Sequence, residues 1–493
     1  MTEKSIKAQL SSILPDRIEI LVSGDPEYGS AIATWNLRAQ HKPRAVIRPS
    51  TAQDVSIVTR AVQCARVDRV TIRAGGHSFE GLGLGGQDGA VVIDMIKMRR
   101  IHSNADAQEV TVEGGALLGE VQTHISQHGN QMLPMGTCPI VGIAGQIQCG
   151  GYGFFSRTYG VLVDRVLEMQ VVTADGEIRT VSDKQHSDLF YALRGSGGGS
   201  FGVITSLTLK TNDIPRAIAN FSIKWKIADC NVAAVLKAAH GACLSSPKGL
   251  NAMLVAWFGT IELYGTLLED SKAQCETIWS DVLSSLPAPS STRMEFFDLL
   301  GSVVDVAKNQ TSAPWYSSLS DLQREGNEHL RYVKIKSGYI PDPLRDSFLD
   351  QLAVIVEVQP TKDVRVHLLT LNPNLIPATD TTSVRCRGCT WFVDMLVFTQ
   401  VGQYGEAGAR AEADKLQRGW LGRIDRLFST VRTGTYLGDD DFDQGRNRNE
   451  MMASFYGPHL PRLMGVKRRY DPGNLFNHPL SVPLPQKTRR QLL

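Results

Sequence analysis

The sequence predicts an α+β protein of two domains, and three observations lead to this expectation. At 493 residues the chain is longer than a single hydrophobic core usually supports. Its first part alternates short β-branched runs with glycine-rich turns, which is typical of many short strands. Near residue 215 the glycine-rich texture ends and longer strand and helix patterns follow, and such a change in composition indicates a domain boundary.

The elements of the first part follow from local patterns. A helix is expected over residues 116–128, because Leu117, Val121 and Ile125 recur at every fourth position. A hairpin is expected at Asp175-Gly176, a pair that supplies the positive φ of a tight turn. Runs rich in Val, Ile and Thr predict strands at residues 70–73, 91–93, 110–112, 169–173 and 178–181. The last two of these flank the Asp175-Gly176 turn and form the hairpin.

The second part predicts a strand at residues 221–227 and helices at 231–244 and 274–286. The apolar run 391–398 is expected to form another strand, with Trp391 on one face and Asp394 on the other. Which of these two faces looks onto a binding site is open from the pattern alone.

Composition excludes several classes of protein. The chain is 42% hydrophobic and 21% charged, with a net charge of +2 and dispersed basic residues, so no nucleic-acid partner is expected. No apolar stretch has the length of a signal peptide or a membrane span, which predicts a cytoplasmic protein without a membrane partner. Eight cysteines form no dense framework, so Cys386 and Cys389 are expected to be ordinary thiols. The oligomeric state is not predicted.

Two nucleophiles stand out because of their surroundings. His77 lies in Arg73-Ala74-Gly75-Gly76-His77-Ser78, and Cys138 lies in Gly136-Thr137-Cys138-Pro139. Glycines let backbone N–H groups approach an anionic pyrophosphate closely, and a side chain among them is held against whatever that pyrophosphate carries. The pair therefore predicts a dinucleotide that is bound covalently.

Together with further motifs, these residues resemble the berberine bridge enzyme-like branch of the vanillyl-alcohol oxidase (PCMH-type FAD-binding) superfamily. The flavin motifs are similar to those of its bicovalent carbohydrate oxidases. The resemblance continues through residues 148–153, 157–160 and 193–205 and ends in 470–476. It covers the two ends of the chain well and the middle poorly.

The resemblance implies a two-domain PCMH-type FAD-binding fold with an inserted α/β substrate domain, in which helices cover an antiparallel sheet. The implied units are an FAD-binding domain at residues 1–215, a substrate-binding domain at 216–440 and a C-terminal segment at 441–493 that returns to the first. FAD is expected to be bonded to His77 through its 8α carbon and to Cys138 through C6. N–H dipoles near Cys138 are expected to depress its thiol pKa. The other implied cofactor-binding residues are Arg73, Gly75, Gly76, Ser78, Val141, Gly142, Gly145, Gly150, Gly151, Gly153, Val203, Ile204 and Asn474.

The resemblance also implies catalytic positions. Val141 matches an oxygen gate, at which valine favours reaction with oxygen. Tyr436 matches the last aromatic residue of a segment beside the flavin and is a candidate base or a packing aromatic. A phenol of ordinary pKa is a poor base at neutral pH, so it would need activation. Asp394 is a candidate partner of Tyr436, and Arg387 matches a family arginine.

Three functions remain open. The leading expectation is an oxidase that takes hydride from a C–H next to oxygen or nitrogen of a small specialised metabolite and gives hydrogen peroxide, with O2 as the second substrate. A carbohydrate oxidase that forms a lactone is the alternative within the same class. A redox-neutral flavoprotein, acting as a cyclase or only binding a ligand, is the alternative from another class.

Overall fold

The computed structural model describes residues 3–196, 198–311, 331–361, 363–374, 381–385, 387–400 and 407–485. Within these residues the strands form four sheets, and helices pack against three of them. The expectation of an α+β fold is therefore confirmed.

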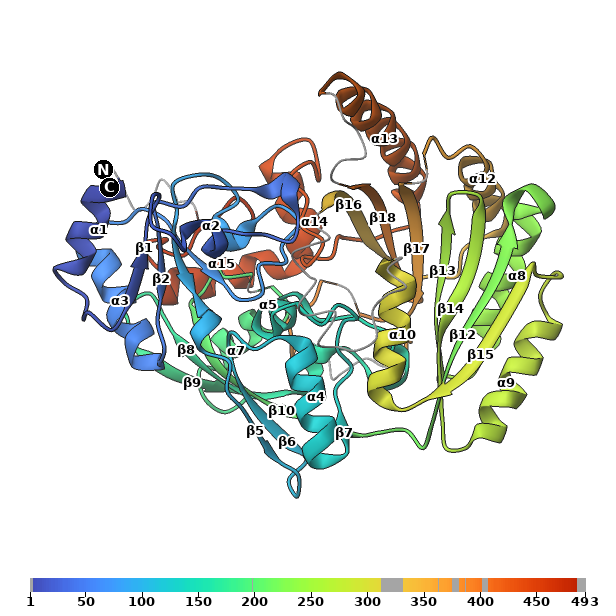
Figure 1. Ribbon diagram of the computed structural model, residues 1–493, viewed down its shortest axis with the longest axis horizontal. Coiled ribbons are helices and arrows are strands. Elements are labelled where there is room, and N and C mark those ends of the chain that lie inside the picture. The colour runs from blue at the N-terminus through green and yellow to red at the C-terminus, as the bar shows by residue number, and fades with distance from the viewer. Residues whose placement is uncertain are drawn as a thin grey trace.

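Two of the sheets lie in the first part of the chain (Figure 1). The four-stranded sheet has the order β1-β2-β4-β3, and β2 and β3 both run parallel to β4. The five-stranded sheet has the order β5-β6-β10-β8-β9 and is antiparallel. These strands are β1 (Glu19–Leu21), β2 (Ala45–Arg48), β3 (Val70–Arg73), β4 (Val91–Asp94), β5 (Ile101–Asn104), β6 (Glu109–Glu113), β8 (Val166–Val172), β9 (Ile178–Ser182) and β10 (Val203–Lys210).

Local sequence explains several of these elements. The turn between β8 and β9 contains Gly176 at a φ of 77°, as the Asp-Gly pair predicts. Helix α3 (Ala52–Cys64) begins where the Thr51 side chain accepts a hydrogen bond from the Asp54 N–H. Helix α4 (Leu118–Gly129) buries Val121 and Ile125 against the five-stranded sheet. The other helices of this part are α1 (Glu3–Ser11), α2 (Tyr28–Ala31), α5 (Ile143–Cys149), α6 (Ser156–Tyr159) and α7 (Ser187–Leu193).

A seven-stranded antiparallel sheet forms the second part, in the order β15-β12-β14-β13-β17-β18-β16. It begins with β12, directly after the short β7–β11 pair, so the sheet changes beside the predicted boundary at residue 216; that boundary itself stays a prediction. Its strands are β12 (Ala217–Lys226), β13 (Leu250–Trp257), β14 (Thr260–Glu269), β15 (Ser291–Phe297), β16 (Arg331–Ile340), β17 (Val364–Thr370) and β18 (Trp391–Gln400), and the small pair is β7 (Gln131–Met132) and β11 (Asn212–Asp213).

Helices cover one face of this sheet, and the other face is turned toward the first part of the chain (Figure 1). Trp391 and Val393 of β18 pack into the helix-covered core, whereas Phe392 belongs to the cluster on the opposite face. The covering helices are α8 (Val232–Ser245), α9 (Lys272–Ser284), α12 (Asp346–Glu357) and α13 (Ala407–Phe428), and α10 (Leu299–Thr311) lies on the other side.

The C-terminal helices α14 (Arg448–Tyr456) and α15 (Leu460–Tyr470) return to the first part of the chain. Met452 and Leu463 lie in the same core as the five-stranded sheet. Phe476 pairs with Val70 at the edge of the four-stranded sheet. The two ends of the chain therefore form one structural unit around the seven-stranded sheet.

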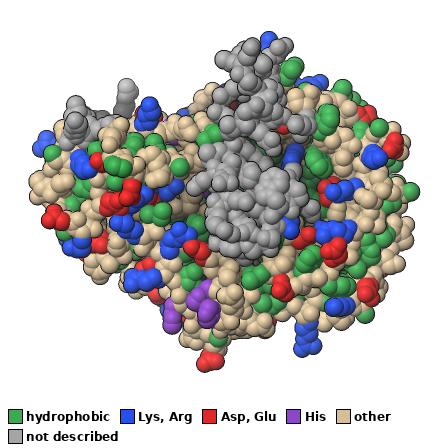
Figure 2. Space-filling model, in the orientation of Figure 1, with side chains coloured by type: hydrophobic (Ala, Val, Ile, Leu, Met, Phe, Trp, Pro, Cys, Tyr) green, Lys and Arg blue, Asp and Glu red, His purple; other side chains and the backbone are tan. Residues whose placement is uncertain are grey.

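On the face of the molecule drawn in Figure 2, no single charge gathers over the coloured residues. Basic and acidic side chains are interspersed there. None of the helices in the described ranges is both long enough and apolar enough to cross a membrane.

Candidate active site

A cavity of about 390 Å³ lies between the loops of the first part and the uncovered face of the seven-stranded sheet. This volume is within the range of small-molecule pockets. It brings together most of the residues that the sequence singled out. These are Arg73, Gly75, Gly76, His77, Ser78, Cys138, Val141, Gly142, Gly145, Gly153, Ile204, Asp394 and Tyr436.

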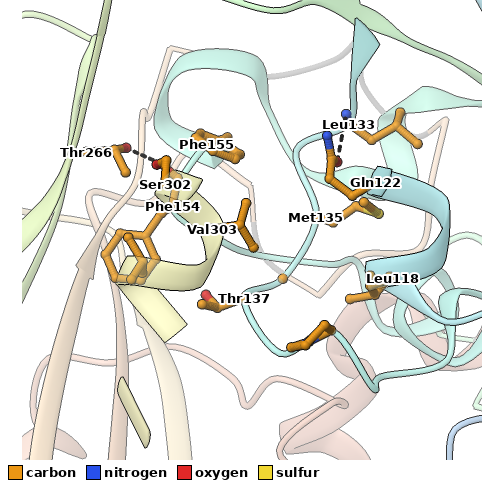
Figure 3. Close-up of a pocket in the computed structure, with 14 residues that line it drawn as sticks. Leu118, Gln122, Leu133, Met135, Thr137, Phe154, Phe155, Thr266, Ser302 and Val303 are labelled. Carbon is orange, nitrogen blue, oxygen red and sulfur yellow. Dashed lines mark hydrogen bonds between the residues drawn. The ribbon is translucent and has the colours of Figure 1, made fainter. Parts of the chain in front are cut away.

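A second, much smaller pocket is lined in part by Thr137 and Pro139, the two neighbours of Cys138 in the chain (Figure 3). Its volume is about 30 Å³, and Leu118, Met135 and Val303 are among the side chains that line it. This space holds one or two water molecules at most. The larger cavity is therefore the candidate active site.

His77 and Cys138 meet at the wall of the cavity. The Cys138 Sγ lies 3.4 Å from the His77 Nε2. Trp35 stacks on the imidazole with ring centroids 4.6 Å apart, and its backbone N–H donates to the Gly76 carbonyl. Sequence analysis missed Trp35, because nothing in a lone tryptophan near the N-terminus indicates this contact.

Burial acts on the two nucleophiles in opposite ways. It lowers the pKa of His77 to about 4, so the imidazole is neutral at physiological pH. It raises the pKa of Cys138 to about 11, and a backbone hydrogen bond at Ile140 offsets only part of this. The expected depression of the Cys138 pKa is therefore wrong, because desolvation outweighs the N–H dipole. His77 has the protonation state of a nucleophile, whereas Cys138 must first lose a proton.

The glycines of the His77 loop and the Cys138 loop allow these two loops to pack closely against each other. A Cβ at Gly75 would lie 2.6 Å from the Ile140 carbonyl oxygen, and one at Gly142 would lie 2.6 Å from the Gly75 nitrogen. Backbone therefore packs directly on backbone, which sets the His77 loop against the Cys138 loop. A cofactor in the cavity would contact both loops at once.

Four predicted cofactor-binding residues do not line the cavity. Gly150 and Gly151 lie just behind it, where the Gly151 N–H donates to the Tyr436 hydroxyl at 3.3 Å. Val203 is buried in β10 opposite Val172. Asn474 lies in the turn after α15, with a φ of 53°.

The motif around Asn474 is a folding device. The buried Asp471 carboxylate accepts from the N–H groups of Leu475 and Phe476, at 2.7 and 2.9 Å. It also accepts from the Lys467 ammonium at 2.7 Å, which in turn donates to the Phe476 carbonyl. These bonds close the turn that places Phe476 beside Val70, which explains the motif without a cofactor.

Tyr436 lies in an aromatic cluster at the cavity wall. Tyr152 and Phe392 meet its ring edge to face, with centroids 5.2 and 5.5 Å away. Burial raises the pKa of Tyr436 well above its ordinary value, and nearby acidic groups raise it further. The phenol therefore keeps its proton, and its hydroxyl accepts a hydrogen bond from the Gly151 N–H.

Tyr152 is a cavity residue that sequence analysis did not single out. Burial raises its pKa to about 12, while the Arg387 guanidinium and a hydrogen bond with Tyr339 lower it. Arg387 is held by two bonds to the Asp164 carboxylate, at 2.7 and 2.8 Å. Of the two cavity tyrosines, Tyr152 is the one beside a cation. An aromatic residue between the glycines of residues 150–153 was the available indication.

Asp394 settles which face of β18 looks into the cavity. It lines the cavity with Phe392, Leu396 and Phe398, on the face opposite Trp391. Its Oδ1 lies 2.8 Å from the Nδ1 of His367, another residue that sequence analysis missed. Asp439 and Asp440, from the loop after Tyr436, add two further carboxyl groups to the wall.

Asp440 ties this loop to the His77 loop. Its carboxylate accepts from the Ser78 hydroxyl at 2.6 Å and from the N–H groups of Phe79 and Glu80 at 2.8 and 2.9 Å. Burial raises the pKa of Asp440 to about 6, although these three bonds lower it.

Cys389 is disulfide-bonded, so the expectation that it is an ordinary thiol is wrong. The other member of the C-x-x-C pair, Cys386, lies outside the described residues.

Comparison with known proteins identifies the two ends of the chain. Residues 43–182 match the model of an FAD binding domain, and residues 435–483 match that of the berberine and berberine-like proteins. The chain therefore carries an FAD binding domain and a berberine-like segment, and it is similar to berberine bridge enzyme-like FAD-linked oxidoreductases. The flavin loops and the Tyr436 loop lie in these two matched segments.

Two relatives align along nearly the whole chain. The FAD-linked oxidoreductase dpmaF of Metarhizium anisopliae is 27% identical over 97% of this chain and 91% of its own. The tetrahydroberberine oxidase of Berberis wilsoniae is 26% identical over 90% of this chain and 85% of its own.

Two solved structures have the same fold. Physcomitrella patens BBE-like 1 superposes with a TM-score of 0.83 at 25% identity, over 98% of this chain and all of its own. The glucooligosaccharide oxidase of Acremonium strictum superposes with a TM-score of 0.81 at 21% identity, over 97% and 99% of the two chains, and is described as carrying 6-S-cysteinyl, 8α-N1-histidyl FAD. The PCMH-type two-domain fold is thereby confirmed.

Proposed function

We propose that the protein is an oxidase that removes hydride from a C–H next to oxygen or nitrogen of a small, largely apolar specialised metabolite. Electrons would pass to O2 and give H2O2. The observation that carries the proposal is the wall of the cavity formed by the seven-stranded sheet. Its described side chains are Met253, Ile335, Leu369, Phe392, Leu396 and Phe398, interrupted by His367 and Asp394.

This wall favours a flat, apolar or aromatic substrate. An oligosaccharide carries hydroxyl groups around each ring, and against an apolar wall those groups lose water without gaining partners. A substrate with one reacting hydroxyl or amine needs only the polar groups that the wall offers. Aromatic rings at Tyr152 and Phe392, stacked with centroids 5.6 Å apart, add a surface for such a substrate.

We infer that FAD is held covalently, through its 8α carbon to His77 and through C6 to Cys138. The neutral His77 imidazole and its 3.4 Å separation from Cys138 support this. The A. strictum enzyme, with its cysteinyl and histidyl links, is consistent with it. When bound, the flavin would supply hydride acceptance and two-electron transfer to oxygen.

Other residues of the cavity would bind the substrate, accept its proton and admit oxygen. Asp394 would accept the substrate proton, and Tyr436 would hold the reacting oxygen or nitrogen by donating a hydrogen bond. Val141, on the opposite wall, would leave oxygen free access.

Anaerobic bleaching of the flavin tests the proposal. The holoenzyme is mixed without oxygen with oligosaccharides, benzylic alcohols, phenols and cyclic amines in turn. Bleaching by a benzylic alcohol, phenol or cyclic amine, followed by peroxide formation in air, is the expected result. Bleaching by oligosaccharides alone would make the protein a carbohydrate oxidase. A flavin that no turnover substrate reduces would favour a redox-neutral role.

A further inference from the structure

One polar row crosses the apolar wall of the cavity. His367 of β17 lies directly opposite Asp394 of β18, and Asp394 lies directly opposite Ser337 of β16. Directly opposed residues of antiparallel strands place their side chains on the same face. Three adjacent strands therefore present His367, Asp394 and Ser337 side by side.

His367 holds one end of this row. Its Nδ1 lies 2.8 Å from the Asp394 Oδ1, and the His367 side chain is only 4% exposed. The separation is that of an ion pair, although the two atoms are not aligned as a hydrogen bond. An imidazole N–H that faces a carboxylate favours its ionised form.

Asp439, in the loop after Tyr436, lies at the other end of this polar row. Burial raises the pKa of Asp439 well above 3.8, the charge of Asp394 raises it further, and Ser337 lowers it. Its buried Oδ2 has no hydrogen-bond partner among the described residues. Two carboxyl groups in one desolvated site do not both ionise, so one of them keeps a proton.

Other ionisable groups face this pair from neighbouring elements. Asp440 is the nearest further carboxyl group, and the tyrosines keep their protons because burial raises their pKa. Among the described residues, no cluster of His, Cys, Asp and Glu is arranged to hold a metal ion. The ionisable groups that interact with Asp394 or Asp439 are Tyr264, Tyr339, Tyr436, Cys149 and Asp440, and Glu262 and Arg365 act in turn on Tyr264.

We propose that His367 and Asp439 are positioning residues that make Asp394 the proton acceptor of the reaction. His367 holds the Asp394 side chain in place at the cavity wall. Asp439 retains a proton beside it, so the pair carries a single negative charge. This inference rests on the proposed oxidation of an alcohol or amine.

The step balances as follows. The substrate O–H or N–H bond breaks, and its proton goes to the Asp394 carboxylate. The neighbouring C–H bond breaks, and its hydrogen leaves with both electrons for the oxidised flavin as a C=O or C=N bond forms. Reoxidation of the bound flavin by O2 would use the hydride and take up one proton to give H2O2, and that proton balances the one that Asp394 releases to solvent.

Infrared spectroscopy of the holoenzyme tests the pair without any substrate. A carbonyl stretch of a protonated buried carboxylic acid is expected at neutral pH and should vanish in Asp439→Asn. In His367→Gln this stretch should persist to higher pH than in the wild type, because the imidazole 2.8 Å from Asp394 is lost and a second negative charge in the pair becomes less favourable. The matched control is His240→Gln, because buried His240 stacks on Trp391 from the helix-covered side and should leave the titration unchanged. Absence of the stretch from the wild type, or a His367→Gln titration equal to the wild type, would overturn the inference.

Kinetics supply the second arm, using whichever compound of the panel bleaches the flavin. Asp394→Asn should slow anaerobic reduction by about 10²–10⁴-fold, as expected for loss of a general base. His367→Gln should slow it less and shift its pH profile upward. An Asp394→Asn rate within a few-fold of the wild type would overturn the assignment. If no compound reduces the wild-type flavin, the proposed function fails, and the infrared titration still decides whether the pair exists.

Discussion

At the scale of single residues, His77 and Cys138 are both expected to carry the flavin. Acid-precipitated protein should stay yellow, and a peptide digest should show flavin mass on both residues. Single His77→Ala and Cys138→Ala variants should each keep the flavin through the other bond. Quantitative release of free FAD by denaturation would exclude both bonds.

The same prediction has a pH dependence. Because the pKa of Cys138 is raised to about 11, its thiolate fraction should rise about tenfold per pH unit through the neutral range. The pKa of His77 is lowered to about 4, so its imidazole is already neutral there. When apoprotein is reconstituted with FAD, attachment at Cys138 should therefore accelerate with pH in the Cys138-only variant His77→Ala. Attachment in Cys138→Ala should not.

Tyr436 is expected to donate a hydrogen bond, since its buried phenol keeps its proton. Tyr436→Phe retains the ring and its contacts with Tyr152 and Phe392. It should slow anaerobic flavin reduction by only a few-fold, measured by stopped flow at saturating substrate. A loss of about 10²–10⁴-fold, typical of a removed general base, would return Tyr436 to that role.

Val141 is expected to affect only the oxygen half-reaction. Its side chain faces the cavity between the two flavin loops. Val141→Leu adds one methylene group there, which should slow reoxidation of photoreduced enzyme in air and leave anaerobic reduction largely intact. A wild-type enzyme that stays reduced in air but passes electrons to a dye would be a dehydrogenase.

At the scale of elements, the turn after α15 depends on one buried ion pair. Lys467 and Asp471 are both fully buried, and removal of one partner leaves the other charge uncompensated. Asp471→Asn should lower the free energy of unfolding by about 3–5 kcal/mol, measured by urea denaturation of the holoenzyme. The matched control is Glu450→Gln, which breaks an exposed pair with Arg446 at the same i,i+4 spacing and should have no measurable effect. Equal stability of both variants would contradict the role assigned to the turn.

Elements encoded by neighbouring residues were predictable. The Asp175-Gly176 hairpin, helix α4 and the strand beginning at Trp391 all follow from local patterns. The register of the strands was not predictable, because the whole sheet sets the pairing of His367 with Asp394 and no local sequence pattern indicates it. The role of Asn474 stays a prediction: it lies outside the cavity lining, its motif is constrained by the buried Asp471 turn, and a motif alone does not say whether it binds or folds.

At the scale of the whole molecule, an ion network joins the three parts of the chain at the cavity rim. Lys334 of β16 contacts Glu80 of the His77 loop at 3.0 Å and also pairs with Asp441 and Asp443 of the C-terminal part. Burial lowers the pKa of Lys334, but these carboxylates outweigh burial and raise it above 10.5. The network therefore fixes the inserted sheet against the flavin loops.

Lys334→Met tests this network through its pH dependence. Because the pKa of Lys334 is raised on folding, its contribution to stability is complete below pH 10.5 and is lost as pH rises through the folded value. At pH 7 the variant should have a lower free energy of unfolding, by less than the about 3–5 kcal/mol of a fully broken buried pair, since Arg38 and Lys336 still contact Glu80 and Asp441. Urea denaturation at increasing pH above 10.5 should show that the difference in free energy of unfolding between wild type and variant shrinks. Groups that titrate in both proteins contribute equally and cancel in this difference. A difference that stays constant across that range would mean that Lys334 acts only by packing, and that other contacts, such as those of Asp440 with the His77 loop, hold the parts of the chain together.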